Sequence, residues 1–279
     1  MTTRTTPQTE IRLVTFTSQG HGVRGRLFIP AGGEPSDLVL LLPGFPGNEK
    51  DVLGVGERLA RAGIGALMFN YRGTYGSEGD YSLPHAQEDI AAAHAFLLSE
   101  RVPASFRTAA GDLVVGGYSF GGGMGLTYTA NNPSIRRAFS IAGTDHGAFM
   151  RIYERDSEFR SMVNEMFTSL AYPEGPVRFA ATQSRPDIAS QKINMKPYDL
   201  RRVAPALANR HLLFLWGWDD VNNRVEHHLV PLYRALVDAG ASRVRIETYA
   251  TDHQFGNVQE GLAADIVDWL GDTSPGNAS

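Results

Sequence analysis

The chain has 279 residues, of which 42% are hydrophobic and 20% are charged, and its formal net charge is −4. This is the composition of an ordinary globular protein, and the slightly acidic balance does not favour binding to nucleic acid or to anionic lipid. There is no cysteine, which excludes disulfides, thiolate metal sites and a catalytic thiol.

The N-terminal stretch MTTRTTPQTE is polar and lacks the apolar run of a secretory signal. The longest apolar run, residues 38–45, is far too short to span a bilayer. We therefore expect a cytoplasmic protein with neither a membrane nor a nucleic acid as partner.

Two strand-like segments come first, residues 11–18 and 23–30, and the glycines between them predict an antiparallel hairpin. Apolar runs and helical spacings then alternate along the chain. Strands are predicted around 37–44, 64–70, 112–118, 136–143, 211–217 and 242–250, and helices around 52–63, 86–100, 123–132, 225–240 and 258–271. This alternation predicts an α/β fold, with a mainly parallel central sheet and helices on both faces.

Residues 144–208 interrupt the alternation, so we predict a helical insert after the sixth strand, within a single domain of residues 1–279. Residues 272–279 are expected to be a flexible tail. We interpret the insert in two alternative ways, as a lid or wall of the substrate pocket or as a helix packed on the core. In the first interpretation its apolar side chains are Met150, Tyr153, Phe159, Met162, Met166 and Phe167.

The stretch GGYSFGGG, residues 116–123, follows a predicted strand and leads into a predicted helix. Gly117 and Gly121 flank Ser119 in the Gly-x-Ser-x-Gly pattern of a nucleophile elbow, a sharp turn that exposes a serine hydroxyl. The Phe120 amide then becomes a candidate oxyanion donor. The alternative is a glycine-rich turn that packs a helix on a strand. The pattern of a P-loop is absent.

A serine needs a base to accept its proton. His253 follows the last predicted strand, which puts it at the same carboxyl edge of the sheet as Ser119. The other seven histidines are interpreted as structural or surface residues. Asp219 and Asp220, at the end of the strand 211–217, are both candidates for the acid that orients the base. Phe45, after Pro43 and Gly44, offers a second oxyanion amide.

Four segments, LLLPGFPG, YRGTYGSEG, GGYSFGGG and HLLFLWGWDD…TDHQF, together resemble the α/β-hydrolase superfamily over residues 37–271. The region after the sixth strand is similar to that of the prolyl-oligopeptidase-like and dienelactone-hydrolase-like branch. The resemblance implies that Ser119 is the nucleophile, His253 the base, Asp220 the acid, and Phe45 the first oxyanion donor. Pro43 stands where the family usually has histidine, and Ser119 where dienelactone hydrolases have cysteine.

These observations predict a serine carboxylic-ester hydrolase with no cofactor or metal and a small-molecule ester as substrate. A peptidase or amidase with the same machinery is the alternative, with Glu154, Asp156 and Glu158 as candidates for holding a substrate amine. A non-catalytic binding protein on the same fold is the third hypothesis.

Overall fold

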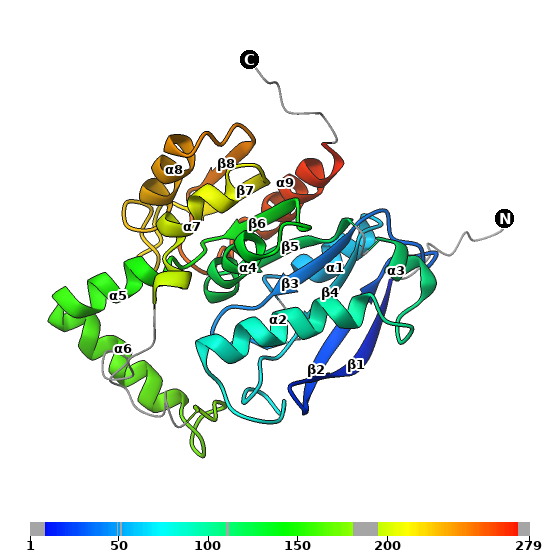
Figure 1. Ribbon diagram of the computed structural model, residues 1–279, viewed down its shortest axis with the longest axis horizontal. Coiled ribbons are helices and arrows are strands. Elements are labelled where there is room, and N and C mark those ends of the chain that lie inside the picture. The colour runs from blue at the N-terminus through cyan, green and yellow to red at the C-terminus, as the bar shows by residue number, and fades with distance from the viewer. Residues whose placement is uncertain (1–8, 49, 51, 110–111, 181–194, 273–279) are drawn as a thin grey trace.

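An eight-stranded sheet forms the centre of the protein in the computed structural model, which describes residues 9–48, 50, 52–109, 112–180 and 195–272 (Figure 1). The strands are β1 (Glu10–Ser18), β2 (His21–Ile29), β3 (Leu38–Leu42), β4 (Gly65–Phe69), β5 (Val114–Tyr118), β6 (Arg137–Ile141), β7 (His211–Gly217) and β8 (Val244–Tyr249). Their order across the sheet is β1-β2-β4-β3-β5-β6-β7-β8. β1–β2 and β2–β4 are antiparallel, and all other pairs are parallel, which confirms the predicted sheet.

The central strands β3 and β4 are buried from end to end, whereas the hairpin at the edge is not. Every residue of β3 and β4 is buried, as the continuous apolar runs LVLLL and GALMF predict for strands covered on both faces. β1 is exposed along most of its length. Gln19 and Gly20 both have positive φ, 48° and 83°, and they make a two-residue hairpin turn that matches the strand twist.

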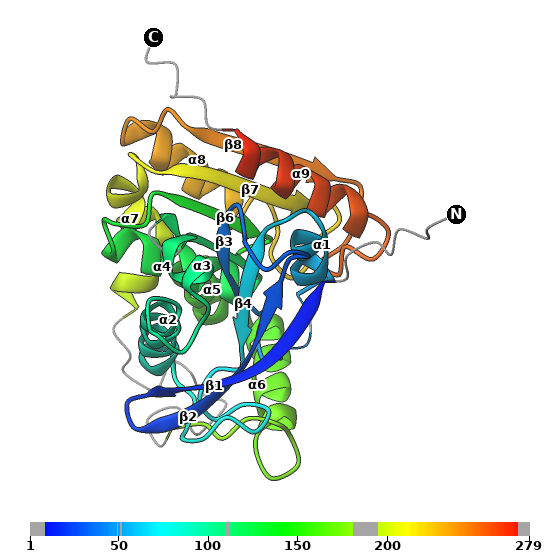
Figure 2. The same ribbon diagram turned by 90° about the vertical axis from the view of Figure 1, so that its right-hand side faces the viewer.

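Helices cover both faces of the sheet, as expected for this fold class (Figure 2). They are α1 (Val55–Arg61), α2 (Leu83–Leu97), α3 (Ala104–Ala109), α4 (Phe120–Asn131), α5 (His146–Arg155), α6 (Ser157–Leu170), the 3₁₀ turn η4 (Lys196–Tyr198), α7 (Leu200–Leu207), α8 (Leu229–Asp238) and α9 (Gln259–Gly271). α1 and α9 pack side by side on one face, and α2, α4, α7 and α8 form the layer on the other. The apolar core contains two large clusters, one with residues of α1, α4, α7, α8 and α9 and the other with residues of α2, α3 and α4.

The helical insert follows β6, the sixth strand, as predicted, and Figure 1 shows α5 and α6 extending beyond one end of the sheet. Asp145 caps α5 by accepting the amides of Gly147 and Ala148 at 2.9 and 3.1 Å. Asp156 caps α6 in the same way. These caps satisfy amides that a helix start leaves without partners, so two short helices can follow one another closely.

The segment that follows α6 returns to the sheet beside the loop that follows β4. Phe179 forms a β-bridge with Tyr81, and the Arg178 guanidinium donates to the Gly79 carbonyl at 3.0 Å and to the Ser77 carbonyl. Both ends of α5–α6 are therefore attached to the sheet layer. α7 lies within the range predicted for the insert but packs against α4 and α8.

Part of the predicted insert, residues 181–194, and nearly all of the predicted tail lie outside the described residues. Among the helices that the structure describes, none combines the length and the apolar character needed to cross a bilayer.

Candidate active site

Ser119 sits in a strained turn between β5 and α4, with φ 51° and ψ −117°. This positive φ is uncommon for a residue with a side chain, and the turn holds it only because the neighbouring backbone is fixed. The Ser119 amide donates to the Ile141 carbonyl at 2.8 Å, and its carbonyl accepts the Thr144 amide at 2.9 Å. β6 and the loop after it therefore clamp the turn from both sides.

The glycines of the motif are required by close packing around that turn. A Cβ on Gly121 would lie 2.4 Å from the carbonyl oxygens of both Leu42 and Pro43, and a Cβ on Gly117 would lie 2.4 Å from the Gly121 carbonyl oxygen. Real Cβ atoms do not approach backbone oxygens so closely. Glycine at both positions lets α4 begin against the ends of β3 and β5.

The hydroxyl of Ser119 is the first member of a hydrogen-bonded chain of three side chains. Its Oγ lies 3.0 Å from Nε2 of His253, and Nδ1 of the same imidazole lies 2.7 Å from Oδ2 of Asp220. Loops from β5, β8 and β7 meet to build this chain, because the carboxyl ends of parallel strands share one edge of the sheet. The arrangement matches the geometry in which a carboxylate orients an imidazole toward a serine hydroxyl.

The structure brings Asp220, and not its neighbour Asp219, to the imidazole. Asp220 is buried, at 3% exposure, whereas Asp219 is exposed. The Asp219 amide donates to the Thr251 carbonyl at 3.0 Å, which extends the hydrogen bonding between β7 and β8 beyond the ends of the two strands. The chain then turns, so the next side chain enters the protein.

Two asparagines hold the Asp220 carboxylate in place, and the sequence analysis missed both. The amides of Asn222 and Asn223 donate to Asp220 Oδ1 at 2.9 and 2.8 Å, which leaves Oδ2 to His253. The Asn223 side chain donates to the Ala142 carbonyl at 2.7 Å and to Thr144 Oγ1 at 2.9 Å. The local sequence signal for this turn is the Asp itself, because an Asp side chain accepts the main-chain amide two residues further along.

Tyr118 fixes the loop that carries the imidazole, a role that the sequence analysis also missed. Its hydroxyl donates to the His253 carbonyl at 2.8 Å, and its ring lies 5.1 Å from the imidazole. Burial raises the pKa of Tyr118, and the carboxylate of Asp220 raises it further, so the phenol keeps its proton. No sequence signal identifies this contact, because the partners are 135 residues apart.

The two predicted oxyanion donors, Phe45 and Phe120, both line the cavity above Ser119. Among the described residues, neither main-chain N–H has a hydrogen-bond acceptor. Phe120 is the first residue of α4, where the N–H groups have no partner within the helix and the helix dipole favours negative charge. Gly44 packs against Tyr118 and Ser119, which brings the β3 loop to the turn.

Two further histidines lie close to the site and are held neutral. Burial lowers the pKa of His146, which lines the cavity, to about 3. Burial also lowers the pKa of His228 to about 4, and its Nδ1 accepts the Asp145 amide at 3.1 Å. At neutral pH these two are uncharged polar groups, and His253 is the histidine that contacts both the serine and a carboxylate.

The cavity over Ser119 has a volume of about 520 Å³ and is roofed by α5 and α6. Met150, Phe159, Met162, Met166 and Phe167 of the insert line it, as the pocket-wall interpretation predicted. The sixth predicted residue, Tyr153, was wrongly included among these residues. Tyr153 is buried between α5 and α6, where its hydroxyl donates to Asn164 Oδ1 at 2.7 Å.

Residues 39–268 match the family described as the alpha/beta hydrolase family. The chain belongs to the α/β hydrolase family. The superfamily resemblance and the fold predicted from the sequence are therefore confirmed. No curated relative matches the sequence of this hydrolase at a significant level.

Solved structures with the same fold include two esterases and a peptidase. A Pyrococcus furiosus esterase has a TM-score of 0.65 and 15% identity, covering 94% of this chain and 92% of its own. A cold-adapted esterase from an Arctic intertidal metagenomic library has a TM-score of 0.60 and 21% identity, with coverages of 96% and 95%. Pyrococcus horikoshii acylaminoacyl peptidase reaches a TM-score of 0.68 at 16% identity, but this hydrolase covers only 41% of that chain.

Proposed function

We propose that this α/β hydrolase cleaves carboxylic esters, with Ser119 as nucleophile, His253 as general base and Asp220 as the acid that orients it. The observation that carries the proposal is the hydrogen-bonded chain from the Ser119 hydroxyl through His253 to Asp220, at 3.0 and 2.7 Å. A serine hydroxyl becomes a competent nucleophile when an adjacent base accepts its proton.

The reaction has two stages. Ser119 Oγ attacks the ester carbonyl while His253 Nε2 takes the proton of the Ser119 hydroxyl. The carbonyl oxygen becomes an oxyanion that accepts hydrogen bonds from the amides of Phe45 and Phe120. His253 then gives the proton to the leaving alcohol, which departs and leaves an acyl-serine. Water, deprotonated by the same imidazole, releases the acid and restores Ser119. Each oxyanion amide supplies about 3 kcal/mol of transition-state stabilisation in related chemistry.

The alternative is amide or peptide cleavage by the same three side chains. The structural similarity to an acylaminoacyl peptidase is the reason to consider it. The carboxylates considered as a grip for a substrate amine do not favour it. Glu154, Asp156 and Glu158 are all exposed, and none of them lines the cavity. The carboxylate of Asp156 is already engaged by the start of α6. We therefore favour ester hydrolysis.

Hydrolysis of p-nitrophenyl butyrate, compared with a set of aminoacyl-p-nitroanilides, tests this proposal. We expect ester turnover to exceed anilide turnover, and we expect Ser119→Ala to abolish it while unfolding at the wild-type temperature. Faster anilide turnover would make the protein an amidase. Full activity of Ser119→Ala, or no turnover of either substrate, would overturn the proposal and favour a binding role.

A further inference from the structure

The described lining of the cavity over Ser119 is uncharged apart from its histidines. Among its lining residues in the described part of the chain there is no Asp, Glu, Lys or Arg, although 20% of the whole sequence is charged. Of the two histidines that line it, His146 is kept neutral by the lowering of its pKa to about 3 on burial. A substrate charge inside this cavity would lose hydration and find no counter-ion among the described lining residues.

The roof of the cavity combines flexible and rigid apolar groups. Four of the seven methionines in the sequence line the cavity, namely Met150, Met162, Met166 and Met195. Unbranched, polarisable methionine side chains adapt to ligands of different shape. Phe45 of the β3 loop packs against Tyr81 and against Phe167 of α6, with ring centroids 4.8 and 5.4 Å apart. These surfaces suit an aliphatic or an aromatic group.

The strand order gives the site two chemically different sides. β3 and β4 lie on one side of β5, and β6, β7 and β8 lie on the other. His253, which must protonate the leaving oxygen, belongs to the β7–β8 side, so the alcohol part of an ester lies there. The cavity residues on that side include Asn222 and Gln254, which are both exposed amides. The acyl part of the ester then lies against the apolar wall around Phe45 and beneath the roof.

We propose that the substrates are uncharged at the acyl end: esters with an apolar acyl group beneath α5–α6, and an alcohol that extends past Asn222 and Gln254 to solvent. This inference rests on the ester hydrolase function proposed above. It predicts an asymmetry, because a charge in the acyl group is buried without a partner, whereas a charge in the alcohol stays hydrated.

Matched esters measure this asymmetry. In the acyl series, p-nitrophenyl esters of hexanoic acid, adipic acid and 6-aminohexanoic acid share a six-carbon chain whose last carbon is a methyl group, a carboxylate or a methylene that bears an ammonium group. We expect kcat/KM to fall at least 100-fold for both charged members. In the alcohol series, choline hexanoate and its uncharged isostere 3,3-dimethylbutyl hexanoate should differ less than tenfold.

A charge introduced into the roof should reverse the preference. Met166 lines the cavity and is 39% exposed, so substitutions there are compatible with folding. We expect Met166→Lys to raise kcat/KM for the adipate monoester at least tenfold over Met166→Gln, an uncharged control, without raising it for the 6-aminohexanoate.

Two failures are distinguishable in these measurements. Charged and uncharged acyl esters turned over within tenfold of each other, or equal adipate rates for Met166→Lys and Met166→Gln, would overturn the substrate class and leave the ester hydrolase standing. No turnover of p-nitrophenyl hexanoate or of any other ester would overturn the ester hydrolase function, and the substrate class with it.

Discussion

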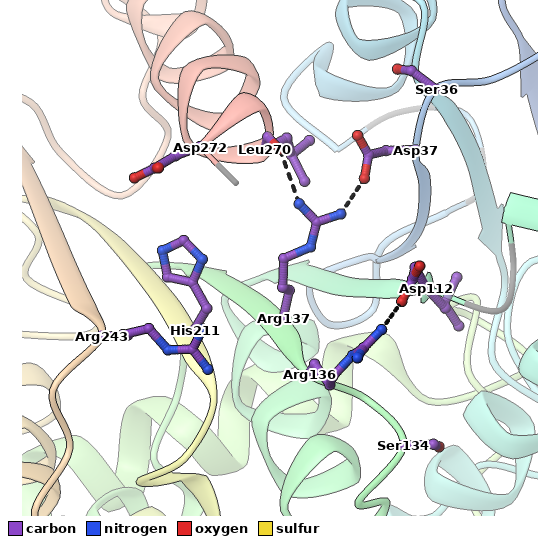
Figure 3. Close-up of a pocket in the computed structure, with 11 residues that line it drawn as sticks. Ser36, Asp37, Asp112, Ser134, Arg136, Arg137, His211, Arg243, Leu270 and Asp272 are labelled. Atoms are coloured by element: carbon purple, nitrogen blue, oxygen red, sulfur yellow. Dashed lines mark hydrogen bonds and ion pairs between the residues drawn. The ribbon is translucent and has the colours of Figure 1, made fainter. Parts of the chain in front are cut away.

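The two edges of the central sheet each carry a cavity, one of about 520 Å³ at the carboxyl ends of the strands and one of about 450 Å³ at their amino ends. At the amino edge, shown in Figure 3, two arginines of the lining form ion pairs with two aspartates. Arg136 pairs with Asp112, and Arg137 bridges Asp37 and the Leu270 carbonyl. These contacts join the starts of three strands to the end of α9.

The carboxyl edge is built in the opposite way. Among the described residues, no charged side chain lines its cavity and the amides of Phe45 and Phe120 have no acceptor, and Ser119 is strained. Hydrogen-bonding capacity that the fold leaves unused is available to a ligand, whereas paired charges mainly stabilise the fold. The contrast assigns chemistry to one edge and stability to the other.

The largest effect that would sharpen this contrast is expected at Asp220. Asp220→Asn replaces the carboxylate that orients His253, and we expect kcat/KM for an ester to fall on the order of 10⁴-fold. Asp219→Asn is the matched control, because its side chain is exposed, and it should retain wild-type kcat/KM. Equal losses in the two variants would contradict the assignment of the acid.

Packing at the elbow should dominate the stability of the carboxyl edge. Gly121→Ala forces a methyl group against two carbonyl oxygens, and we expect a loss of about 3 kcal/mol in the free energy of unfolding in urea. Gly261→Ala adds a methyl group in α9 where no atom lies within 4 Å, and we expect a gain of about 0.5 kcal/mol. If Gly121→Ala left the free energy of unfolding unchanged, the turn would not be close-packed.

At the amino edge, stability and activity should separate. Arg137→Gln loses a partly buried ion pair and a bond to Leu270, so we expect about 2 kcal/mol less stability with an unchanged kcat/KM. The control Arg136→Gln removes an exposed pair and should cost under about 0.5 kcal/mol. An activity loss in Arg137→Gln without a stability loss would break the contrast between the edges.

A pH dependence of stability, similar in size to the effect of Arg137→Gln, is expected from a buried histidine near the active site. The pKa of His228 is lowered to about 4 in the folded protein, so the unfolded chain binds the proton first as the pH falls. Stability is therefore lost on going from pH 7 to pH 5, by about 2 kcal/mol for this one histidine. His228→Asn keeps an acceptor for the Asp145 amide and should remove that part of the loss in urea unfolding. In the exposed control His227→Asn, the loss of stability between pH 7 and pH 5 should equal that of the wild type. A loss of wild-type size in His228→Asn would contradict a buried neutral imidazole at position 228.

The sequence predicted the parts of the molecule that local patterns encode. Buried apolar runs and helical spacing predicted the sheet and the insert. The positions of Ser119 and His253 at one edge of the sheet followed because each comes directly after a predicted parallel strand. The residues alone left Asp219 and Asp220 open, because the choice depends on which side chain enters the protein, and only the family resemblance implied Asp220. Tyr153 was misassigned because helical spacing does not reveal which neighbour covers a helix face.

The most direct test of the proposed nucleophile is covalent labelling with a fluorophosphonate, followed by peptide mapping. We expect one label per chain, located on Ser119, and much slower labelling of His253→Ala because its serine has no base. Absence of label on the folded wild-type protein, or label on a different residue, would contradict the claim that this serine is activated by the histidine and the aspartate.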